Sequence, residues 1–385
     1  MVGLITLFSC LFTLTFIDPP HGNNYIINHP IASILHARIV IDGNDELNDF
    51  CAGNGTDGTA SNPHVIQYYE FTQDMATQIS LSNTNLHVVV LNCTISSSGD
   101  IYSMDMGINL NNATNVRITQ CWFERNKYDI LGDNNCDNLI ISGNKFAGGN
   151  EVGFINGSTN LLLENNTFLA ETRFLRFNNT RYLRILNNSY IGSITCHKFN
   201  AWRDGIVANN TLINVGSGFW GYGETVNATF INNSLLDCRI GFTGFSNVII
   251  ENNTLDCYEV GLTAANSIIK NNIIKNCSTI GMGISNCTVK HNIIENCSGL
   301  GGIYYDATDH SNLFLENKFY NNTIGIFDES REISNTYIGN EFRDNGIAIY
   351  LEPLNVNFAS DDTFLYNNSF FNSSIMHVAV NDSHL

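Results

Sequence analysis

Residues 248–255 read VIIENNTL, and close copies follow as IIKNNII at residues 268–274 and as TVKHNII at residues 288–294. In each copy an apolar residue stands three positions before an Asn, and another stands two positions after it. The pattern occurs thirteen times, at intervals of 19 to 28 residues, which is typical of a protein built from stacked repeats. The central residues are Cys93, Cys121, Asn144, Asn166, Asn188, Asn210, Asn233, Asn253, Asn272, Asn292, Asn317, Asn340 and Asn368.

The repeat units are too short, and too rich in β-branched and aromatic residues, to be pairs of helices. Their apolar residues do not recur at helical spacing, and Asn, Gly and Ser interrupt each unit. Short strands joined by tight turns fit better. If each unit is one coil, equivalent residues lie about 4.8 Å apart in neighbouring coils. The sequence therefore predicts an all-β solenoid, a single-stranded parallel β-helix of about thirteen coils.

The central Asn column is predicted to be a buried ladder, because a side-chain amide can both donate to and accept from its neighbours in a stack. Cys93 and Cys121 replace Asn at one end as small buried residues. The preceding residue is Asn at eight of the thirteen positions and Gly at two, which indicates a turn with positive φ. The same turn chemistry creates N-glycosylation sequences, such as those at Asn165 and Asn209, and leaves their use as glycan sites open.

The composition favours a rigid scaffold whose polar surface depends mainly on uncharged residues. The chain has 385 residues, of which 58 are Asn and only 14% are charged. The formal net charge of −18 argues against a general nucleic-acid binder, which needs a basic field. Acidity this diffuse is typical of a soluble protein.

The amino-terminal residues suggest export. Residues 2–17 form an uncharged apolar run, which is short for a membrane span and suitable for the core of a signal peptide. We therefore expect residues 1–20 to be a signal peptide or a short anchor, and the protein to be extracytoplasmic, secreted or on the cell surface. No second apolar run of spanning length follows, so no further transmembrane segment is expected.

The eleven cysteines are predicted to be mostly structural thiols. Cys238, Cys277 and Cys297 each follow their ladder Asn by five residues, and Cys257 falls one residue earlier, so they form a second buried stack. Parallel Cβ vectors in such a stack are unfavourable for disulfides, and a linear row of thiols does not close a tetrahedral metal site.

Residues 40–44 (VIDGN), 55–66 (GTDGTASNPHVI) and 91–94 (LNCT) resemble the entry segment of right-handed parallel β-helix proteins of the pectate-lyase-like superfamily, most closely its NosD-like archaeal members. The resemblance implies a right-handed helix over residues 86–385, behind an N-terminal cap and entry segment at residues 21–85. It also raises an accessory role in copper-enzyme maturation, although the ten histidines share no column. The fold itself hosts many functions.

A candidate ligand-binding surface lies in the middle of the chain. Arg176, Lys198 and Trp220 each stand ten residues after their ladder Asn, and are therefore predicted to stack on three successive coils. Arg181 and Arg203 each stand fifteen residues after theirs. Stacked like charges repel, so they suit either a solvated strip or a site for an anionic ligand. The predicted ligand-binding residues are Arg176, Arg181, Lys198, Trp202, Arg203, Trp220 and Tyr222, with aromatic rings suited to sugars.

Two classes of function follow, and we favour the first. The first is a non-catalytic, exported or surface β-helix protein that binds carbohydrate or another surface polymer. The second is a polysaccharide lyase or epimerase acting on acidic polysaccharide, with Arg176, Lys198 or His197 as the base and Asp204 or Glu224 as its partner. Of these residues, His197, Asp204 and Glu224 are the weak candidates for catalytic residues. No metal or cofactor is expected. Calcium binding near Asp42 and Asp45 lacks the spacing of a known loop.

Overall fold

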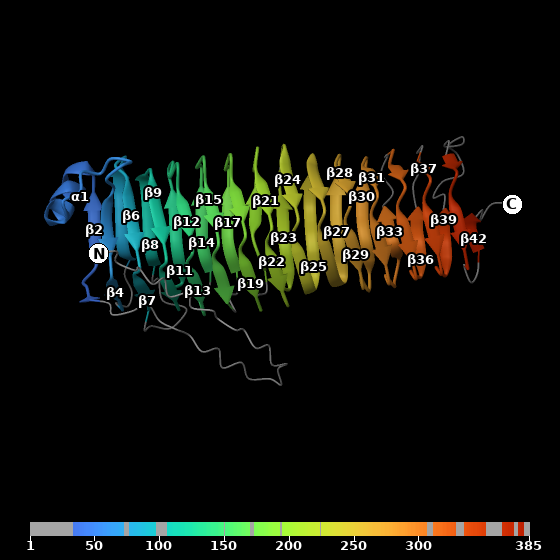
Figure 1. The fold of residues 1–385 in the computed structure, drawn as a ribbon, viewed down its shortest axis with the longest axis horizontal. Coiled ribbons are helices and arrows are strands. Elements are labelled where there is room, and N and C mark those ends of the chain that lie inside the picture. The colour runs from blue at the N-terminus through green and yellow to red at the C-terminus, as the bar shows by residue number, and fades with distance from the viewer. Residues whose placement is uncertain are drawn as a thin grey trace, which may run out of the picture.

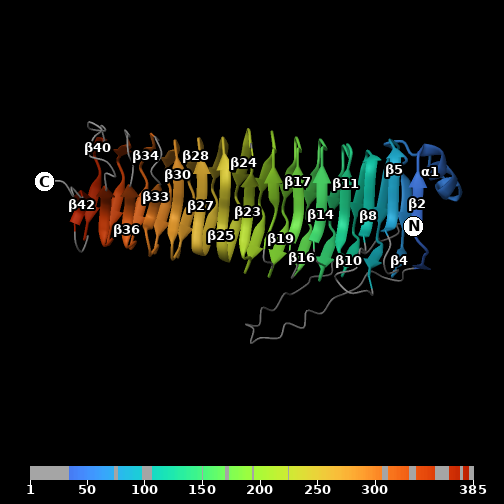
Figure 2. The same ribbon diagram turned by 180° about the vertical axis from the view of Figure 1, so that it is seen from behind.

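The described part of the chain forms an elongated rod of stacked parallel coils, and its one α-helix lies at the amino-terminal end (Figure 1). The same regular stacking is visible from behind (Figure 2). The structure is a computed structural model. It describes residues 34–72, 77–97, 106–149, 151–169, 173–192, 195–223, 225–305, 311–328, 335–351, 364–372 and 376–380.

Every strand pairing is parallel, and a complete coil contributes one strand to a 14-stranded sheet and two to a 28-stranded sheet. Since each coil adds one strand to the 14-stranded sheet, the number of coils is close to the expected thirteen. The 14-stranded sheet contains β3 (His64–Gln67), β6 (Val88–Leu91), β9 (Val116–Thr119), β12 (Ile140–Ser142), β15 (Leu162–Glu164), β18 (Arg184–Leu186), β21 (Ile206–Ala208), β24 (Ala228–Ile231), β26 (Val248–Glu251), β28 (Ile268–Lys270), β31 (Thr288–Lys290), β34 (Leu313–Leu315), β37 (Thr336–Ile338) and β40 (Phe364–Tyr366).

The 28-stranded sheet consists of two rows of strands. The first row contains β1 (Ile34–Leu35), β4 (Tyr69–Phe71), β7 (Thr94–Ser96), β10 (Trp122–Glu124), β13 (Lys145–Ala147), β16 (Thr167–Leu169), β19 (Ser189–Ile191), β22 (Thr211–Ile213), β29 (Ile273–Lys275), β32 (Ile293–Glu295), β35 (Lys318–Tyr320), β38 (Glu341–Arg343) and β41 (Ser369–Phe371). The second row contains β2 (Ile39–Asp42), β5 (Thr77–Thr84), β8 (Met106–Ala113), β11 (Tyr128–Asp133), β14 (Glu151–Asn156), β17 (Arg173–Asn178), β20 (Lys198–Asn200), β23 (Ser217–Tyr222), β30 (Ile280–Ser285), β33 (Gly301–Tyr305), β36 (Ile324–Asp328), β39 (Ile347–Leu351) and β42 (Met376–Val380). The long strands β25 (Ser234–Ser246) and β27 (Thr254–Ala265) run through both rows and join them.

The amino-terminal end is covered by helix α1 (Asn44–Cys51), which continues into the 3-10 turn η1 (Ala52–Asn54). Leu47 and Cys51 on this helix are fully buried. Parallel pairing already joins β2 to β5 and β3 to β6, so solenoid strands extend into the segment that the sequence assigned to the cap. The Asp42 carboxylate accepts a hydrogen bond from Asn83 Nδ2 at 2.7 Å, which gives this acid a role within the entry segment.

The predicted Asn ladder is confirmed. The side-chain Oδ1 of Asn210 accepts hydrogen bonds from the backbone N–H and from Nδ2 of Asn188, at 2.9 and 3.0 Å. Its own Nδ2 donates to Asn233 Oδ1 at 2.9 Å and to the carbonyl of Ile185 at 2.9 Å. The residues just before the ladder, including Asn209 with φ of 56°, adopt the expected left-handed conformation. A side chain that both donates and accepts can thus continue the ladder from coil to coil.

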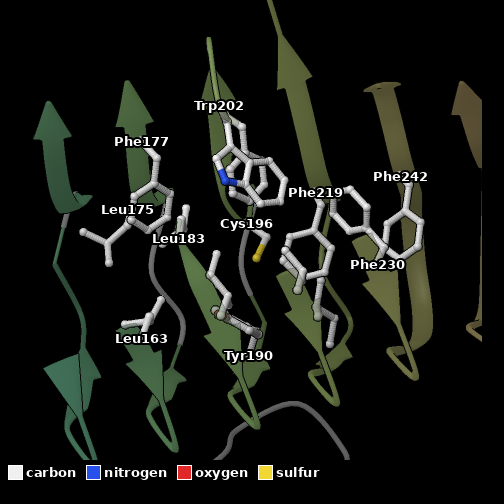
Figure 3. Packing of buried hydrophobic residues seen from close by; sticks show 14 of the residues in the cluster. Leu163, Leu175, Phe177, Leu183, Tyr190, Cys196, Trp202, Phe219, Phe230 and Phe242 are labelled. Carbon is white, nitrogen blue, oxygen red and sulfur yellow. The ribbon is translucent and has the colours of Figure 1, made fainter. Parts of the chain in front are cut away.

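Aromatic rings stack in the core beside the ladder. The ring centroids of Phe123, Phe146, Phe168 and Tyr190 follow one another at 4.9, 4.8 and 4.6 Å, with interplanar angles of 11°, 6° and 4°. All four side chains are fully buried. Figure 3 shows the denser cluster that follows, where Phe219, Phe230 and Phe242 gather between the strands.

The ten cysteines within the described part of the chain are buried free thiols, as expected. Cys238 and Cys257 lie side by side in the parallel register, which supports the second stack. Burial raises the pKa of the Cys238 thiol to about 11 and keeps it protonated. Cys10 and the expected leader at residues 1–20 lie outside the described residues.

Candidate functional site

An open hollow of about 420 Å³ lies on the outer side of the second row, in the middle of the rod. It is lined by Phe154, Arg176, Phe177, Asn178, Lys198, Phe199, Asn200, Trp220 and Tyr222. Four of the seven predicted ligand-binding residues therefore meet there. Among the described residues, the lining contains two cationic side chains and no carboxylate, in a protein whose net charge is −18.

Two parallel columns of side chains form the site. Neighbouring residues of a strand point to opposite sides, so alternate residues of β14, β17, β20 and β23 face outward. The register places Arg176 beside Lys198 and Lys198 beside Trp220, as the spacing predicted. Phe154 precedes Arg176 in this column. Two residues further along each strand, Asn156, Asn178, Asn200 and Tyr222 form the second column.

Arg176 is held by a carboxylate that is almost completely buried. Its Nη2 donates to Glu151 Oε2 at 2.7 Å, and its Nε donates to Oε1 of the same side chain. Glu151 is only 3% exposed, so the arginine compensates a charge that would otherwise be stranded in the protein. This hydrogen-bonded pair raises the pKa of Arg176, which therefore stays protonated. Arg176 is a fixed cation and is excluded as a general base.

Lys198 and Trp220 form a cation–π pair. The Lys198 Nζ lies 4.5 Å from the centre of the Trp220 ring, close to the ideal position for this interaction. The ammonium group thereby covers one face of the indole, while 39% of Trp220 remains exposed. Tyr222 is 70% exposed and presents the most accessible aromatic ring of the site.

The amide column is ordered by hydrogen bonds from coil to coil. Asn178 Nδ2 donates to Asn156 Oδ1 at 3.0 Å, and Asn156 Nδ2 donates to Asp133 Oδ1 at 3.0 Å. Asn200 Nδ2 in turn donates to Asn178 Oδ1. Each amide is therefore fixed in orientation before any ligand binds, so less side-chain entropy is lost on binding.

The prediction that Trp202 offers a ring to the ligand is wrong. Trp202 is fully buried and lies within the core cluster (Figure 3). Its ring stacks on that of Phe199, with centroids 4.6 Å apart. It stands fourteen residues after its ladder Asn, and the same offset places Ser158 and Thr180 at buried positions. The indole lies against the main chain at Gly205, where an added Cβ would come within 2.2 Å of the ring.

His197 also points inward, because it precedes the outward-facing Lys198 by one residue. It is fully buried, its Nε2 lies 2.6 Å from the Tyr190 hydroxyl, and its Nδ1 lies 3.2 Å from the Leu175 carbonyl. The carbonyl can only accept, so Nδ1 carries the proton and Nε2 accepts from Tyr190. Burial lowers the pKa of His197 to about 3, and the ring is neutral. This geometry does not suit a base that acts on an external ligand.

The second predicted basic column, Arg181 and Arg203, lies in register at the turn after the second row, outside the lining of the hollow. Arg181 Nε donates to Asp204 Oδ2 at 2.9 Å, and Asn227 Nδ2 donates to Asp204 Oδ1 at 3.2 Å. The bond from Arg181 lowers the pKa of Asp204, so this carboxyl is an ionised partner of an arginine. The third catalytic candidate, Glu224, lies outside the described residues.

Phe154, Asn178 and Asn200 were missed at the sequence level. Phe154 stands ten residues after Asn144, which is the same offset as that of Arg176, Lys198 and Trp220, so the repeat register would have found it. Within the described ranges, no group of three or more His, Cys, Asp or Glu side chains is placed to hold a metal ion. The described helices are all too short or too polar to cross a membrane.

Residues 175–319 match the family described as "Right handed beta helix region", a segment that includes most of the hollow. The chain forms a right-handed parallel β-helix. A comparison with curated proteins finds no match.

Several solved structures are similar in fold at low sequence identity. The mannuronan C-5 epimerase AlgE4 A-module of Azotobacter vinelandii is 11% identical, with a TM-score of 0.43, and the similarity covers 90% of this chain and 95% of that one. Bacteriophage CBA120 tailspike protein 3 is 14% identical, with a TM-score of 0.43, over 83% of this chain and 52% of that one. The catalytic domain of a GH87 α-1,3-glucanase is 12% identical, with a TM-score of 0.34, over 91% and 70% of the two chains.

Proposed function

We propose that the hollow binds an extended acidic polysaccharide, and that the protein is a non-catalytic carbohydrate-binding scaffold exported to the cell surface or beyond. The observation that carries this proposal is the pair of columns parallel to the rod. One column provides Arg176 and Lys198, and the other provides oriented amides that end at the exposed ring of Tyr222. Both columns follow the stacking direction, and a linear polymer laid along them would meet one residue of each column at every coil.

The three kinds of side chain suit three parts of such a ligand. Amide groups of Asn178 and Asn200 can donate to and accept from sugar hydroxyls. The Tyr222 ring can pack against the apolar face of a sugar ring. Lys198 can pair with a carboxylate of the ligand, and the N–H groups of Arg176 that are not bonded to Glu151 can donate to another. The preorganised columns reduce the entropy cost of binding.

The alternative function, a lyase or epimerase on acidic polysaccharide, needs a base beside the ligand. Among the described residues, the titratable groups that line the hollow are Arg176, Lys198 and Tyr222. Arg176 is a fixed cation, which leaves Lys198 and Tyr222 as candidates for proton transfer there. His197 and Asp204 are engaged elsewhere. We therefore favour binding over turnover. A second hypothesis is that the protein is a NosD-like accessory protein of copper-enzyme maturation. Within the described ranges, no cluster of three or more His, Cys, Asp or Glu side chains supports it.

The test uses Lys198→Ala combined with Tyr222→Ala, and leaves the buried Glu151–Arg176 pair intact. We expect affinity for polygalacturonate, measured by isothermal titration calorimetry, to fall about tenfold or more, since hydrogen bonds to charged groups and ring contacts each contribute about 1 kcal/mol or more. Affinity of the parent should also weaken as salt rises, because exposed charges are screened beyond about 8 Å at physiological ionic strength.

The matched control is Lys290→Ala combined with Tyr258→Ala, which removes the same two side-chain types outside the hollow. An equal loss in this control would show that binding depends only on net charge and would contradict the proposal. Release of unsaturated uronates from polygalacturonate, or a changed uronate composition after incubation, would instead identify an enzyme.

A further inference from the structure

The outer column that contains Arg176, Lys198 and Trp220 continues beyond the hollow toward the carboxyl end of the rod. Trp220 lies beside Thr243, and the hydroxyls of Thr243 and Thr263 are hydrogen bonded at 2.8 Å. Further toward the carboxyl end, the same column reaches three aromatic residues. The column continues through Gly283, Tyr304, Phe327 and Tyr350.

These three aromatic residues form a stack of their own on the outer side of the second row. The ring centroids of Tyr304 and Phe327 are 5.7 Å apart with an interplanar angle of 30°, and those of Phe327 and Tyr350 are 5.2 Å apart with an angle of 22°. All three are partly exposed. The residues beside them along each strand, such as Ile326 and Ile349, are fully buried, so the aromatic stack is separate from the core.

Between the hollow and this aromatic stack, the column itself contains only small residues, namely Thr243, Thr263 and Gly283. Thr263 Oγ1 also accepts from the backbone N–H of Gly244 at 2.9 Å, which holds the hydroxyl close to the sheet. From Trp220 to Tyr304 there are four coil steps, or roughly 19 Å at about 4.8 Å per step. A straight path therefore connects the two sets of side chains without a bulky residue of this column between them.

We propose that Tyr304, Phe327 and Tyr350 form a second contact site for the same polysaccharide, so that one extended chain spans both sites along the rod. This inference rests on the proposed function of the hollow. Aromatic edges and faces provide apolar surface for the C–H groups of sugars, whereas the hollow provides charge and amides. Because the two sites are fixed on one rigid sheet, binding of a long chain at the first site raises its effective concentration at the second.

The consequence is a dependence of affinity on chain length. A tetramer of galacturonate reaches only one site, and a chain long enough to span both gains avidity without any new kind of contact. We expect affinity, measured by calorimetry over oligogalacturonates of increasing length, to rise by about tenfold or more once the chain spans both sites.

The variant for this test is Phe327→Thr combined with Tyr350→Thr, because threonine is the residue that this column carries at positions 243 and 263. It should lower affinity for the long chains to the level of the tetramer and leave tetramer binding unchanged. The matched control is Tyr320→Thr combined with Phe371→Thr, which removes two aromatic rings from the first row at a similar height of the rod. The control should preserve the length dependence.

A substitution midway along the path provides a second check. An added Cβ at Gly283 would meet the ends of the Ile280 and Thr263 side chains at 3.3 and 3.4 Å and the Tyr304 carbonyl oxygen at an ordinary contact distance of 3.8 Å, so a side chain is tolerated there. Gly283→Glu should repel the acidic polymer and reduce long-chain affinity severalfold relative to Gly283→Gln, with equal tetramer binding in both variants.

Equal affinity for short and long chains in the parent would overturn the second site and leave the hollow standing. An unchanged length dependence in the Phe327→Thr, Tyr350→Thr variant would do the same, because the extra affinity would then not come from the aromatic stack. Equal long-chain affinity of Gly283→Glu and Gly283→Gln would also overturn the spanning path. If the parent binds no oligogalacturonate of any length, both the proposed function and this inference fail.

Discussion

Two of the inner corners of the rod satisfy their polar groups in different ways. At the ladder corner, between the 14-stranded sheet and the first row, each Asn from Asn144 to Asn340 donates to the Asn of the next coil. At the corner between the second row and the 14-stranded sheet, which we call the tryptophan corner, the buried residues of four successive coils are Ser158, Thr180, Trp202 and Thr225. Thr180 Oγ1, Trp202 Nε1 and Thr225 Oγ1 are buried there and have no hydrogen-bond partner among the residues that the structure describes.

The difference follows from the chemistry of the side chains. An amide has two donors and an acceptor on one rigid group, so a column of amides can extend through any number of coils. An indole has one donor and no acceptor, so Trp202 cannot continue a column of hydroxyls. The tryptophan corner gains apolar burial from the large ring and leaves its neighbouring hydroxyls unpaired. We therefore expect replacement of a polar side chain by an apolar one to lower the free energy of unfolding at the ladder corner and to raise it at the tryptophan corner.

The largest effect is expected at the ladder corner. Asn210→Leu removes the acceptor for two donors of Asn188 and the donor for the Ile185 carbonyl. Each buried group left unpaired costs about 1 to 3 kcal/mol, so the free energy of unfolding should fall by several kcal/mol. Chemical denaturation measures this loss.

Asn209→Gly is the matched control, because Asn209 is exposed and has a φ of 56° that glycine adopts readily. It should change the free energy of unfolding by less than about 1 kcal/mol. A greater loss for Asn209→Gly than for Asn210→Leu would mean that the turn, and not the buried amide, determines the stability of the ladder corner.

An intermediate effect is expected from His197, which is buried in the same coil as Trp202 but has hydrogen-bond partners. Its pKa is about 3 in the folded protein and 6.5 without burial. Between these two pH values His197 is protonated in the unfolded chain and neutral in the folded protein. The contribution of His197 to the free energy of unfolding is therefore fully present above about pH 6.5 and decreases as the pH falls toward 3. The slope from this group is about 1.4 kcal/mol per pH unit.

His197→Gln removes this titration and keeps a side chain that can accept from Tyr190. Its free energy of unfolding should therefore depend less on pH than that of the parent between pH 6.5 and 4. Asp204→Asn is the control, because the lowered pKa of Asp204 places its titration below this window. Parallel pH profiles for the parent and His197→Gln would show that the histidine is accessible to protons in the folded protein.

The fold could be predicted from the sequence because each structural column repeats thirteen times at nearly constant offsets. Even residues such as Gln120 and Glu316, which rarely adopt positive φ, take the turn conformation that the register assigns to them, at 54° and 51°. The same register placed Arg176, Lys198 and Trp220 together, because parallel strands keep equivalent offsets side by side.

The rest of the site depends on the direction of each side chain and on its partner, which the chemistry of a residue type does not give. His197 is a catalytic candidate by its chemistry alone, although it precedes the outward-facing Lys198 by one residue and adjacent strand residues face opposite sides. Trp202 was assigned to the surface by its chemistry, whereas its offset is that of the buried Ser158 and Thr180. The pairing of Arg176 with Glu151 joins two strands 25 residues apart and depends on a side-chain conformation, so no spacing rule predicts it.

The smallest effect, and the one with the opposite sign, is expected at the tryptophan corner. Thr180→Val replaces a buried hydroxyl that has no partner with a methyl group of similar size. Because the hydroxyl loses its water on folding and gains no hydrogen bond, valine should stabilise the protein by about 1 kcal/mol. Thermal melts of Thr180→Val and Thr180→Ser distinguish this explanation from a packing effect, since serine keeps the hydroxyl and removes only the methyl group. If valine destabilises the protein as much as serine does, the Thr180 hydroxyl has a partner in solution, such as a buried water, and the two corners satisfy their polar groups equally well.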